Sequence, residues 1–399
     1  MSDHLASDGV GDPRGMLPTT EAAARLGVKP QTLYAYVSRG LLHRTVAMDG
    51  RSSLFDPAEL DALKLGRVDR TEGELRTIIA TGITRVDDHE LSVRGAPLVR
   101  LVMHDGNGFG ELVDHLWVAP EGERWPDPDP TLTTRLTGID GLRSLVAAAS
   151  SADALRHDLA PGSVRAAGRS MIVAMTHGLV PLGRGKDRDP VAALWRRLTK
   201  RPGTAPQRRA LDVALALLVD HGIAASTFAA RIAASVRADP YSVVSAGLGA
   251  IGGPLHGAAS ADVHGLIAEA AATEDAAGAV GAALRGSGRL PGYGHSVYTV
   301  QDPRYGALME AVVDAWTDDP RLHHVFRVRD IVSERRSELP NIDLALGALT
   351  WLSGMDARAG ETIFAIARTA GWLAHAIEEY DESPLRFRPR ARYTRPADQ

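Results

Sequence analysis

Three short runs of the chain place side chains that share or move protons in turns punctuated by glycine or proline. Gly253-Pro254-Leu255-His256-Gly257 carries one histidine, Pro291-Gly292-Tyr293-Gly294-His295 carries another, and Pro340-Asn341-Ile342-Asp343 carries an aspartate. Glycine beside a histidine lets the backbone approach a ligand closely and adopt a positive φ. Imidazole can donate a hydrogen bond when neutral, and a carboxylate can act as a base. Either histidine alone is most simply a structural residue, so a functional interpretation depends on the three runs together.

In this order and with these flanking residues, the three runs resemble the catalytic set of the citrate synthase family. The family reaction condenses acetyl-CoA with oxaloacetate and then hydrolyses the thioester, and its first step removes a proton from the methyl group beside the thioester. The resemblance implies that Asp343 is the base and that His256 and His295 are hydrogen-bond donors, to the thioester oxygen and to the ketone of oxaloacetate respectively. The resemblance implies that no metal is required, and the widely spaced histidines do not form a ligand cluster in the sequence.

Further residues match positions at which the family binds its substrates. Oxaloacetate is a dianion, and the planar fork of arginine can hold both oxygens of a carboxylate. The resemblance implies that the substrate-binding residues are His221, Arg304, Arg368 and Arg388. Arg388 would reach the site of the partner subunit in a homodimer.

The resemblance implies no permanently bound cofactor, because the CoA thioester is a co-substrate. Its contacts would be Gly292, Tyr293 and Gly294. The family often has Lys or Arg for a CoA phosphate shortly after the second histidine, where this chain has Thr299. Arg289 or Arg165 could provide that cation instead.

The elements that must position these residues are predicted to be mainly α-helical. Helical periodicity is seen over residues 208–219, 263–284, 305–316 and 361–380. Short β signals occur only near residues 77–94, where Asp87-Asp88 is typical of a turn between two strands. The resemblance covers nearly all of this body and implies a two-domain helical fold. The large domain would comprise residues 67–257 and 355–399, and the small domain residues 258–354.

Residues 16–66 differ from the rest of the chain and follow a flexible tail, residues 1–15. Thr19 or Thr20 is placed to cap a helix that ends at Gly27, and Pro30 opens a second helix. A hairpin and a helix over 57–65 follow, an order that resembles the small winged helix-turn-helix domain of the MerR and excisionase type. If the domain binds DNA, the contacts would be Lys29, Gln31, Thr32, Tyr34, Arg39 and Arg51. Basic residues barely outnumber acidic ones here, so a domain used only for protein contacts is the alternative.

Composition agrees with a globular protein of 399 residues, with 44% hydrophobic and 24% charged residues and a net charge of −4. The chain has no cysteine, which excludes disulfides and thiolate chemistry. Its first residues are polar rather than signal-like, and its apolar runs are too short for a membrane helix. The sequence therefore predicts a cytoplasmic protein with no membrane contact.

Other functions stay open beside citrate synthesis. A 2-methylcitrate synthase would use propionyl-CoA, which differs by one methylene that a pocket distinguishes by only about 1–3 kcal/mol. A DNA-binding regulator could use the synthase-like body as a metabolite sensor, and an inactive paralogue could assemble with another synthase subunit. The presence of Asp343 argues against the regulator and the inactive paralogue, because neither a sensor nor an inactive subunit needs a base.

Overall fold

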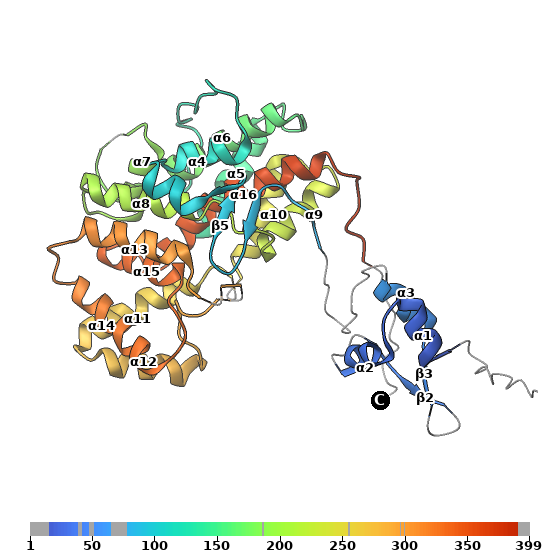
Figure 1. The fold of residues 1–399 in the computed structure, drawn as a ribbon. Coiled ribbons are helices and arrows are strands. Elements are labelled where there is room, and N and C mark those ends of the chain that lie inside the picture. The colour runs from blue at the N-terminus through green and yellow to red at the C-terminus, as the bar shows by residue number, and fades with distance from the viewer. Residues whose placement is uncertain are drawn as a thin grey trace, which may run out of the picture. The chain divides into compact units, whose positions relative to one another are not determined.

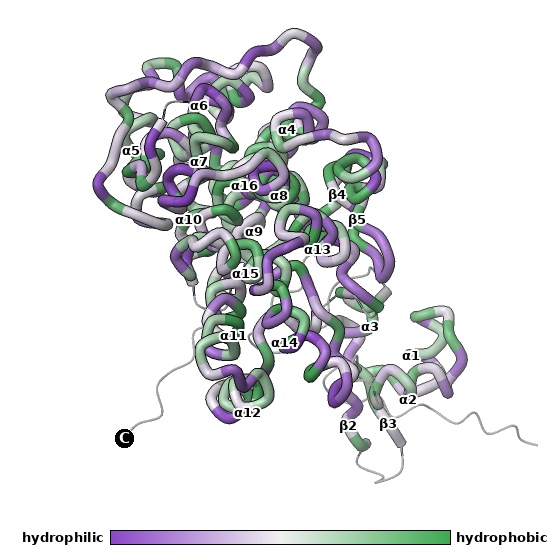
Figure 2. Tube along the Cα trace, turned by 90° about the vertical axis from the view of Figure 1, so that its left-hand side faces the viewer, coloured by the Kyte–Doolittle hydropathy of each residue, from purple (hydrophilic) through white to green (hydrophobic). Residues whose placement is uncertain are grey.

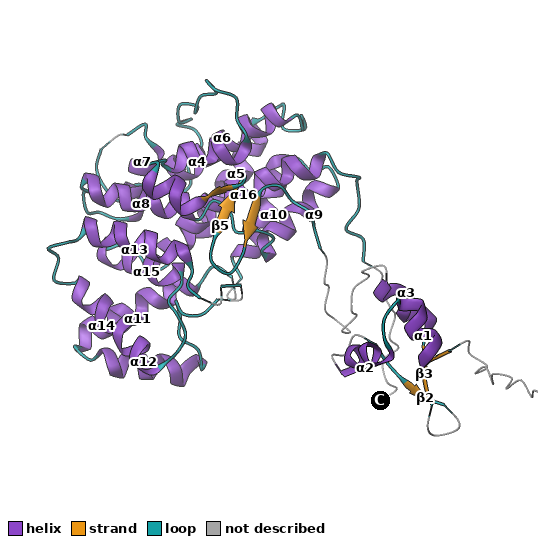
Figure 3. Ribbon diagram, in the orientation of Figure 1, coloured by secondary structure: helices purple, strands orange, loops and turns teal. Residues whose placement is uncertain are grey.

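The computed structural model describes residues 16–38, 42–47, 52–64, 78–185, 187–253, 256–295, 297–298 and 300–389. The chain divides into two compact units, Met1–Ala80 and Thr81–Gln399. Helices dominate the secondary structure and the strands are short (Figure 3). The prediction of a mainly α-helical chain is therefore confirmed.

In its described residues, the first unit combines short strands with three helices. Its elements in chain order are β1 (Leu17–Pro18), α1 (Thr19–Leu26), α2 (Pro30–Ser38), β2 (Thr45–Val46), β3 (Ser53–Phe55) and α3 (Pro57–Lys64). The strands form an antiparallel sheet in the order β1-β3-β2, with Leu17 opposite Phe55 and Thr45 opposite Leu54. A small core of fully buried residues, including Leu33 and Phe55, holds the helices to this sheet.

The prediction that Thr19 or Thr20 caps the first helix is wrong. The extended Pro18 precedes the helix and both threonines lie within it. The hydroxyl of Thr19 instead donates to the carbonyl oxygen of Ser53 at 3.3 Å, which ties α1 to β3. At the other end the helix stops as predicted at Gly27, whose φ of 72° is the left-handed conformation that glycine adopts readily.

The second unit opens with a three-stranded antiparallel sheet and continues as helices. The sheet comprises β4 (Thr84–Val86), β5 (Leu91–Val93) and β6 (Ala96–Pro97), and a π-helical turn, Arg100–His104, follows it. The helices are α4 (Phe109–Trp117), α5 (Gly138–Ala152), α6 (Pro161–Gly178), α7 (Pro190–Leu198), α8 (Ala205–Leu217), α9 (Ala225–Ser235), α10 (Pro240–Ile251), α11 (Ala259–Thr273), α12 (Ala276–Ser287), α13 (Pro303–Ala315), α14 (Leu322–Arg335), α15 (Ile342–Leu352) and α16 (Ala359–Tyr380).

Helix α16 is the centre of packing in this unit and contacts α4, α5, α6, α9 and α10 (Figure 1). Hydrophobic and hydrophilic residues alternate along the surrounding helices (Figure 2), as expected where each helix buries one face. A separate, smaller core joins α11, α12 and α14. Among its described residues, the second unit therefore contains one large hydrophobic core and one small one.

Two sequence predictions in this unit can be compared directly with its elements. The turn at Asp87-Asp88 is confirmed, because Asp87 Oδ1 accepts the N–H groups of His89 and Glu90 between β4 and β5. The helical stretch over 263–284 is interrupted, because Glu274 adopts a left-handed φ of 53°. Asp275 then begins α12 by accepting the N–H of Gly278 at 2.8 Å.

Among the described residues, no helix has both the length and the apolar character that crossing a bilayer requires.

Candidate active site

Two of the predicted histidines, far apart in the sequence, meet at the centre of the site. The rings of His221 and His295 lie edge to face with centroids 5.1 Å apart. Tyr298, which the sequence did not single out, completes the group: its hydroxyl lies 2.9 Å from His221 Nε2, and its ring centroid lies 4.5 Å from that of His295. The loop before α9 and the loop before α13 therefore share one polar cluster.

The surroundings of His295 fix its protonation. Its Nδ1 accepts the backbone N–H groups of Val297 and Tyr298 at 3.0 and 3.2 Å. Since an N–H can only donate, Nδ1 is an acceptor, and the proton of the neutral ring lies on Nε2. Burial, with the positive charge of Arg304, holds the pKa of His295 below its usual range. His295 is therefore a neutral N–H donor near pH 7.

His256 is paired with a hydroxyl group. Its Nε2 lies 2.8 Å from Oγ of Ser226, a fully buried residue in the first turn of α9. Burial and the nearby Arg368 lower the pKa of His256. When the hydroxyl donates to Nε2, the ring proton lies on Nδ1, which makes His256 a second neutral donor. The sequence did not identify Ser226, although its position shortly after His221 offered a signal.

Asp343 lies in the first turn of α15, where Asn341 caps the helix by accepting the Asp343 N–H at 3.0 Å. Burial raises the pKa of Asp343 to about 6, with Arg304 opposing the shift and Asp302 adding to it. A carboxyl group with a pKa of about 6 is ionised at neutral pH and remains a stronger base than an ordinary aspartate.

The turn that carries His295 is built against the start of α15. Gly292 and Gly294 have φ values of 80° and 74°. Their backbones pair with the segment before α15, because Gly294 N–H donates to Leu339 O and Asn341 N–H donates to Gly292 O, each at 2.9 Å. Asn341 Nδ2 also donates to Gly294 O at 2.8 Å. These bonds hold the loops of His295 and Asp343 together, as an active site containing both would require.

Two predicted arginines are buried around the cluster. Arg304 is 3% exposed and forms a two-pronged ion pair with Asp302, with both N–O distances 2.9 Å. Arg368 is 1% exposed and donates through Nε to Leu218 O at 3.0 Å. In the described part of the chain, its Nη2 is buried without a hydrogen-bond partner. A buried guanidinium with an unsatisfied N–H group is suited to an anionic ligand.

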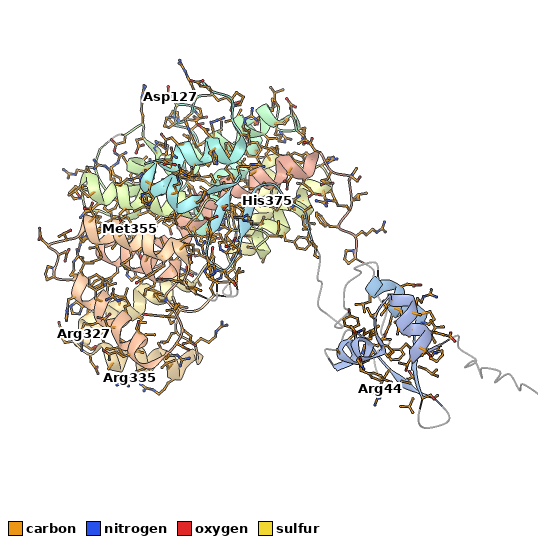
Figure 4. All side chains as sticks on the ribbon, viewed as in Figure 1. Arg44, Asp127, Arg327, Arg335, Met355 and His375 are labelled. Atoms are coloured by element: carbon orange, nitrogen blue, oxygen red, sulfur yellow. The ribbon has the colours of Figure 1, made fainter. Side chains whose placement is uncertain are left out.

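A buried polar network centred on Asp220 holds the turn that carries His221. Asp220 Oδ2 accepts from Thr84 Oγ1 at 2.5 Å, from Gly222 N–H at 3.2 Å and from His375 Nε2 at 3.3 Å. His375 lies on α16 inside the helical body (Figure 4), and its Nδ1 accepts from Arg231 at 2.7 Å. The turn carrying His221 is thereby fixed. Burial, with the charges of Arg304 and Arg368, holds the pKa of His221 well below its usual range.

The remaining predicted residues differ in how they relate to this cluster. Arg388 is exposed on the segment after α16, and no hydrogen bond or ion pair joins it to the other site residues that the structure describes. Tyr293 is largely buried, which raises its pKa. Arg165, the alternative cation for CoA, is already paired with Glu123 at 2.7 Å. Within the described ranges, no three His, Asp or Glu side chains are grouped to hold a metal ion.

In the first unit, Lys29, Gln31 and Tyr34 are exposed and Thr32 is partly exposed, all on or just before α2. Arg39 and Arg51 lie outside the described residues. Arg25 is paired with Asp61 at 2.6 Å, so one basic side chain is already neutralised. The winged helix-turn-helix assignment and its DNA contacts stay predictions.

Comparison with known proteins gives a family match over the second unit. A family model described as citrate synthase, C-terminal domain, matches residues 131–390. The citrate synthase of Haloferax volcanii is 36% identical over 187 residues, which is 46% of this chain and 49% of the relative. The 2-methylcitrate synthase 1 of Corynebacterium glutamicum is 30% identical over 193 residues, 48% of this chain and 50% of the relative. The chain thus spans about half the length of each of these relatives.

Among solved structures, the citrate synthase of Thermoplasma acidophilum in a ternary complex with carboxymethyl coenzyme A and oxaloacetate has the same fold. The TM-score is 0.66 at 24% sequence identity, and the alignment covers 81% of this chain and 95% of that chain.

Proposed function

Because the chain belongs to the citrate synthase family, we propose that it condenses acetyl-CoA with oxaloacetate and hydrolyses the thioester to give citrate and CoA. The observation that carries this proposal is the convergence of three features: a desolvated carboxyl group, neutral imidazole donors and a buried arginine with an unsatisfied N–H group. The related structure of Thermoplasma acidophilum, which holds oxaloacetate and a CoA analogue, supports this choice of substrates.

The first step is removal of a proton from the methyl group of acetyl-CoA by Asp343. The resulting enolate places negative charge on the thioester oxygen, where a hydrogen bond from His256 would stabilise it. A neutral donor suits this task because it can be fixed in place by Ser226 without adding a buried charge. The low pKa of His256, caused by burial and Arg368, keeps it neutral.

The second step joins the enolate carbon to the ketone carbon of oxaloacetate. His295 donates through Nε2 to the ketone oxygen and so increases the electrophilic character of the carbon. Arg304 and Arg368 hold the carboxylates, with His221 beside them. Water then hydrolyses the thioester and releases CoA. CoA is a co-substrate of this reaction, and the turn formed by Gly292, Tyr293 and Gly294 would contact it. No permanently bound cofactor is needed.

The reaction is tested by CoA release from purified protein with acetyl-CoA, with and without oxaloacetate, read by a thiol reagent. The chain has no cysteine, so the protein itself gives no signal. We expect oxaloacetate-dependent release that falls at least about a thousandfold in D343N, because the base is lost. D314N, which changes an exposed aspartate on α13, is the matched control. Release that persists in D343N would contradict the assigned base.

A second candidate is 2-methylcitrate synthesis from propionyl-CoA, which the similarity to the Corynebacterium glutamicum enzyme favours. The same assay decides between the two when both acyl donors are compared. The more efficient donor identifies the reaction.

We further propose that the chain contains the family's large domain, residues 67–257 and 355–399, and its small domain, residues 258–354. In a homodimer, Arg388 would complete the partner's site. Residues 16–66 would form a winged helix-turn-helix, and the regulator hypothesis predicts that D343N keeps ligand-dependent DNA binding while losing condensation.

A further inference from the structure

The carboxyl group of Asp302 makes contacts to which the proposed reaction assigns no role. Its Oδ1 accepts from the backbone N–H and from Nε of Arg304, at 3.1 and 2.9 Å. Its Oδ2 accepts from Nη2 of Arg304 at 2.9 Å and from the backbone N–H of Ile342 at 3.0 Å. Asp302 is 2% exposed. One buried carboxylate therefore joins the first turn of α13 to the first turn of α15.

These two helix starts carry different parts of the site. Arg304 on α13 is the cation proposed for a carboxylate of oxaloacetate, and Asp343, immediately after Ile342 on α15, is the proposed base. We propose that Asp302 is a positioning residue that holds Arg304 and Asp343 in a fixed relation, so that the substrate-binding cation and the base are aligned by one group. This inference rests on the proposed function.

The hydrogen-bond pattern leaves Arg304 able to bind substrate while paired. Asp302 occupies Nε and Nη2, and no hydrogen bond joins Nη1 to any described residue. A buried guanidinium needs a compensating charge before substrate arrives, and Asp302 provides it. Burial opposes ionisation of Asp302, but the charge of Arg304 and the hydrogen bonds it accepts hold its pKa below the usual range. The Asp302–Arg304 pair is therefore ionised in the free protein, and Asp302 fixes the orientation of the guanidinium group.

A second Asp-Pro-Arg run in the same chain provides a comparison, because it has the same local hydrogen bonds without the link to another helix. Asp319 accepts from the backbone N–H, Nε and Nη2 of Arg321 at 3.0, 3.0 and 2.6 Å, which repeats the pattern of Asp302 and Arg304. The side chains of Arg321 and Asp319 are 32% and 21% exposed. In the described part of the chain, the carboxyl group of Asp319 accepts no backbone N–H other than that of Arg321. What distinguishes Asp302 is thus its burial and its bond to Ile342.

The test compares D302N with the matched variant D319N in the full-length protein. Asparagine keeps an acceptor for a backbone N–H group but cannot hold the guanidinium with two charged oxygens. We expect D302N to bind oxaloacetate at least about tenfold more weakly by calorimetry and to raise its KM similarly. Its kcat should also fall, while the KM for the acyl-CoA donor should change less than about twofold. D319N should match the wild type in all of these values.

An oxaloacetate affinity of D302N within about twofold of the wild type would overturn the proposal, as would an equal loss in D319N. If D302N does not fold, D302E retains the charge but displaces the carboxylate by one methylene, and wild-type affinity in that variant would also overturn it. Wild-type protein that binds oxaloacetate but releases no CoA would refute the proposed reaction, and weakened binding in D302N would still support the inference. Absence of oxaloacetate binding by the wild type would overturn both.

Discussion

Asp343 is a carboxyl group whose surroundings disfavour its negative charge. Burial raises its pKa to about 6, Asp302 adds to the shift, and Arg304 opposes it. The pKa values of the three site histidines, His221, His256 and His295, are instead lowered, because the histidines are buried and lie near arginines. Each group therefore holds the protonation state that its proposed task requires at neutral pH.

The first residue-scale prediction concerns the acid side of the pH profile. The base must be deprotonated, so kcat/KM for the acyl donor should be constant above about pH 7 and fall by about tenfold per pH unit below about pH 6. The histidines should add no inflection above pH 6, because their lowered pKa values keep them neutral there. Initial rates measured from roughly pH 5 to pH 8 test this. A value of kcat/KM that stays constant down to about pH 5, as an ordinary aspartate would give, would contradict the desolvation of Asp343.

At the scale of elements, the glycine turn before His295 depends on backbone shape as well as on space. Both Gly292 and Gly294 have positive φ, which strains any residue with a Cβ atom. A Cβ at Gly292 would lie 2.7 Å from Val263 Cγ2 and 3.1 Å from Leu344 Cα, whereas a Cβ at Gly294 would have no atom within 4 Å. The two positions therefore share strain but differ in packing.

We expect G294A to lower the free energy of unfolding by about 1 kcal/mol and G292A to lower it by about 2–4 kcal/mol. The difference arises because α11 and α15 must move apart to admit a methyl group at position 292. Urea unfolding of both variants measures it, with G294A as the control for strain alone. Equal losses would show that the turn relaxes freely and does not hold the His295 loop against α15.

The sequence indicated which residues of this region could form a site, but not which residues they would contact. The glycine and proline around His256, His295 and Asp343 predicted turns. Gly292 and Gly294 before His295 do have positive φ, whereas Asp343 lies in the first turn of α15. Nothing local predicted that Ser226 would pair with His256 or that Asp302 would reach Ile342, because those contacts depend on tertiary packing between distant segments. The break between α11 and α12 was also missed, since the helical periodicity continues across it while the backbone at Glu274 does not.

At the scale of the whole molecule, one predicted site residue, Arg388, is exposed and has no hydrogen bond or ion pair with the site residues that the structure describes. Arg388 follows a segment anchored to the helical body by Arg386, which pairs with Glu379 through two bonds of 2.7 Å. Phe387 also packs edge to face on Phe228 of α9, with centroids 5.4 Å apart. This anchoring presents Arg388 at the surface of its own chain, which is where a residue donated to a partner subunit would have to lie.

A mixture of two inactive variants tests that donation. R388A keeps its own Asp343 but gives its partner no arginine, whereas D343N lacks its base but still donates Arg388. In a mixed dimer, the R388A subunit would receive Arg388 from the D343N subunit and so have a complete site. Random exchange of equal amounts should therefore restore about a quarter of wild-type activity, because about half of the dimers are mixed and each has one complete site. If Arg388 acted within its own chain, neither subunit of the mixed dimer would be complete, and unfolding and refolding the two variants together would restore no activity above that of the separate proteins.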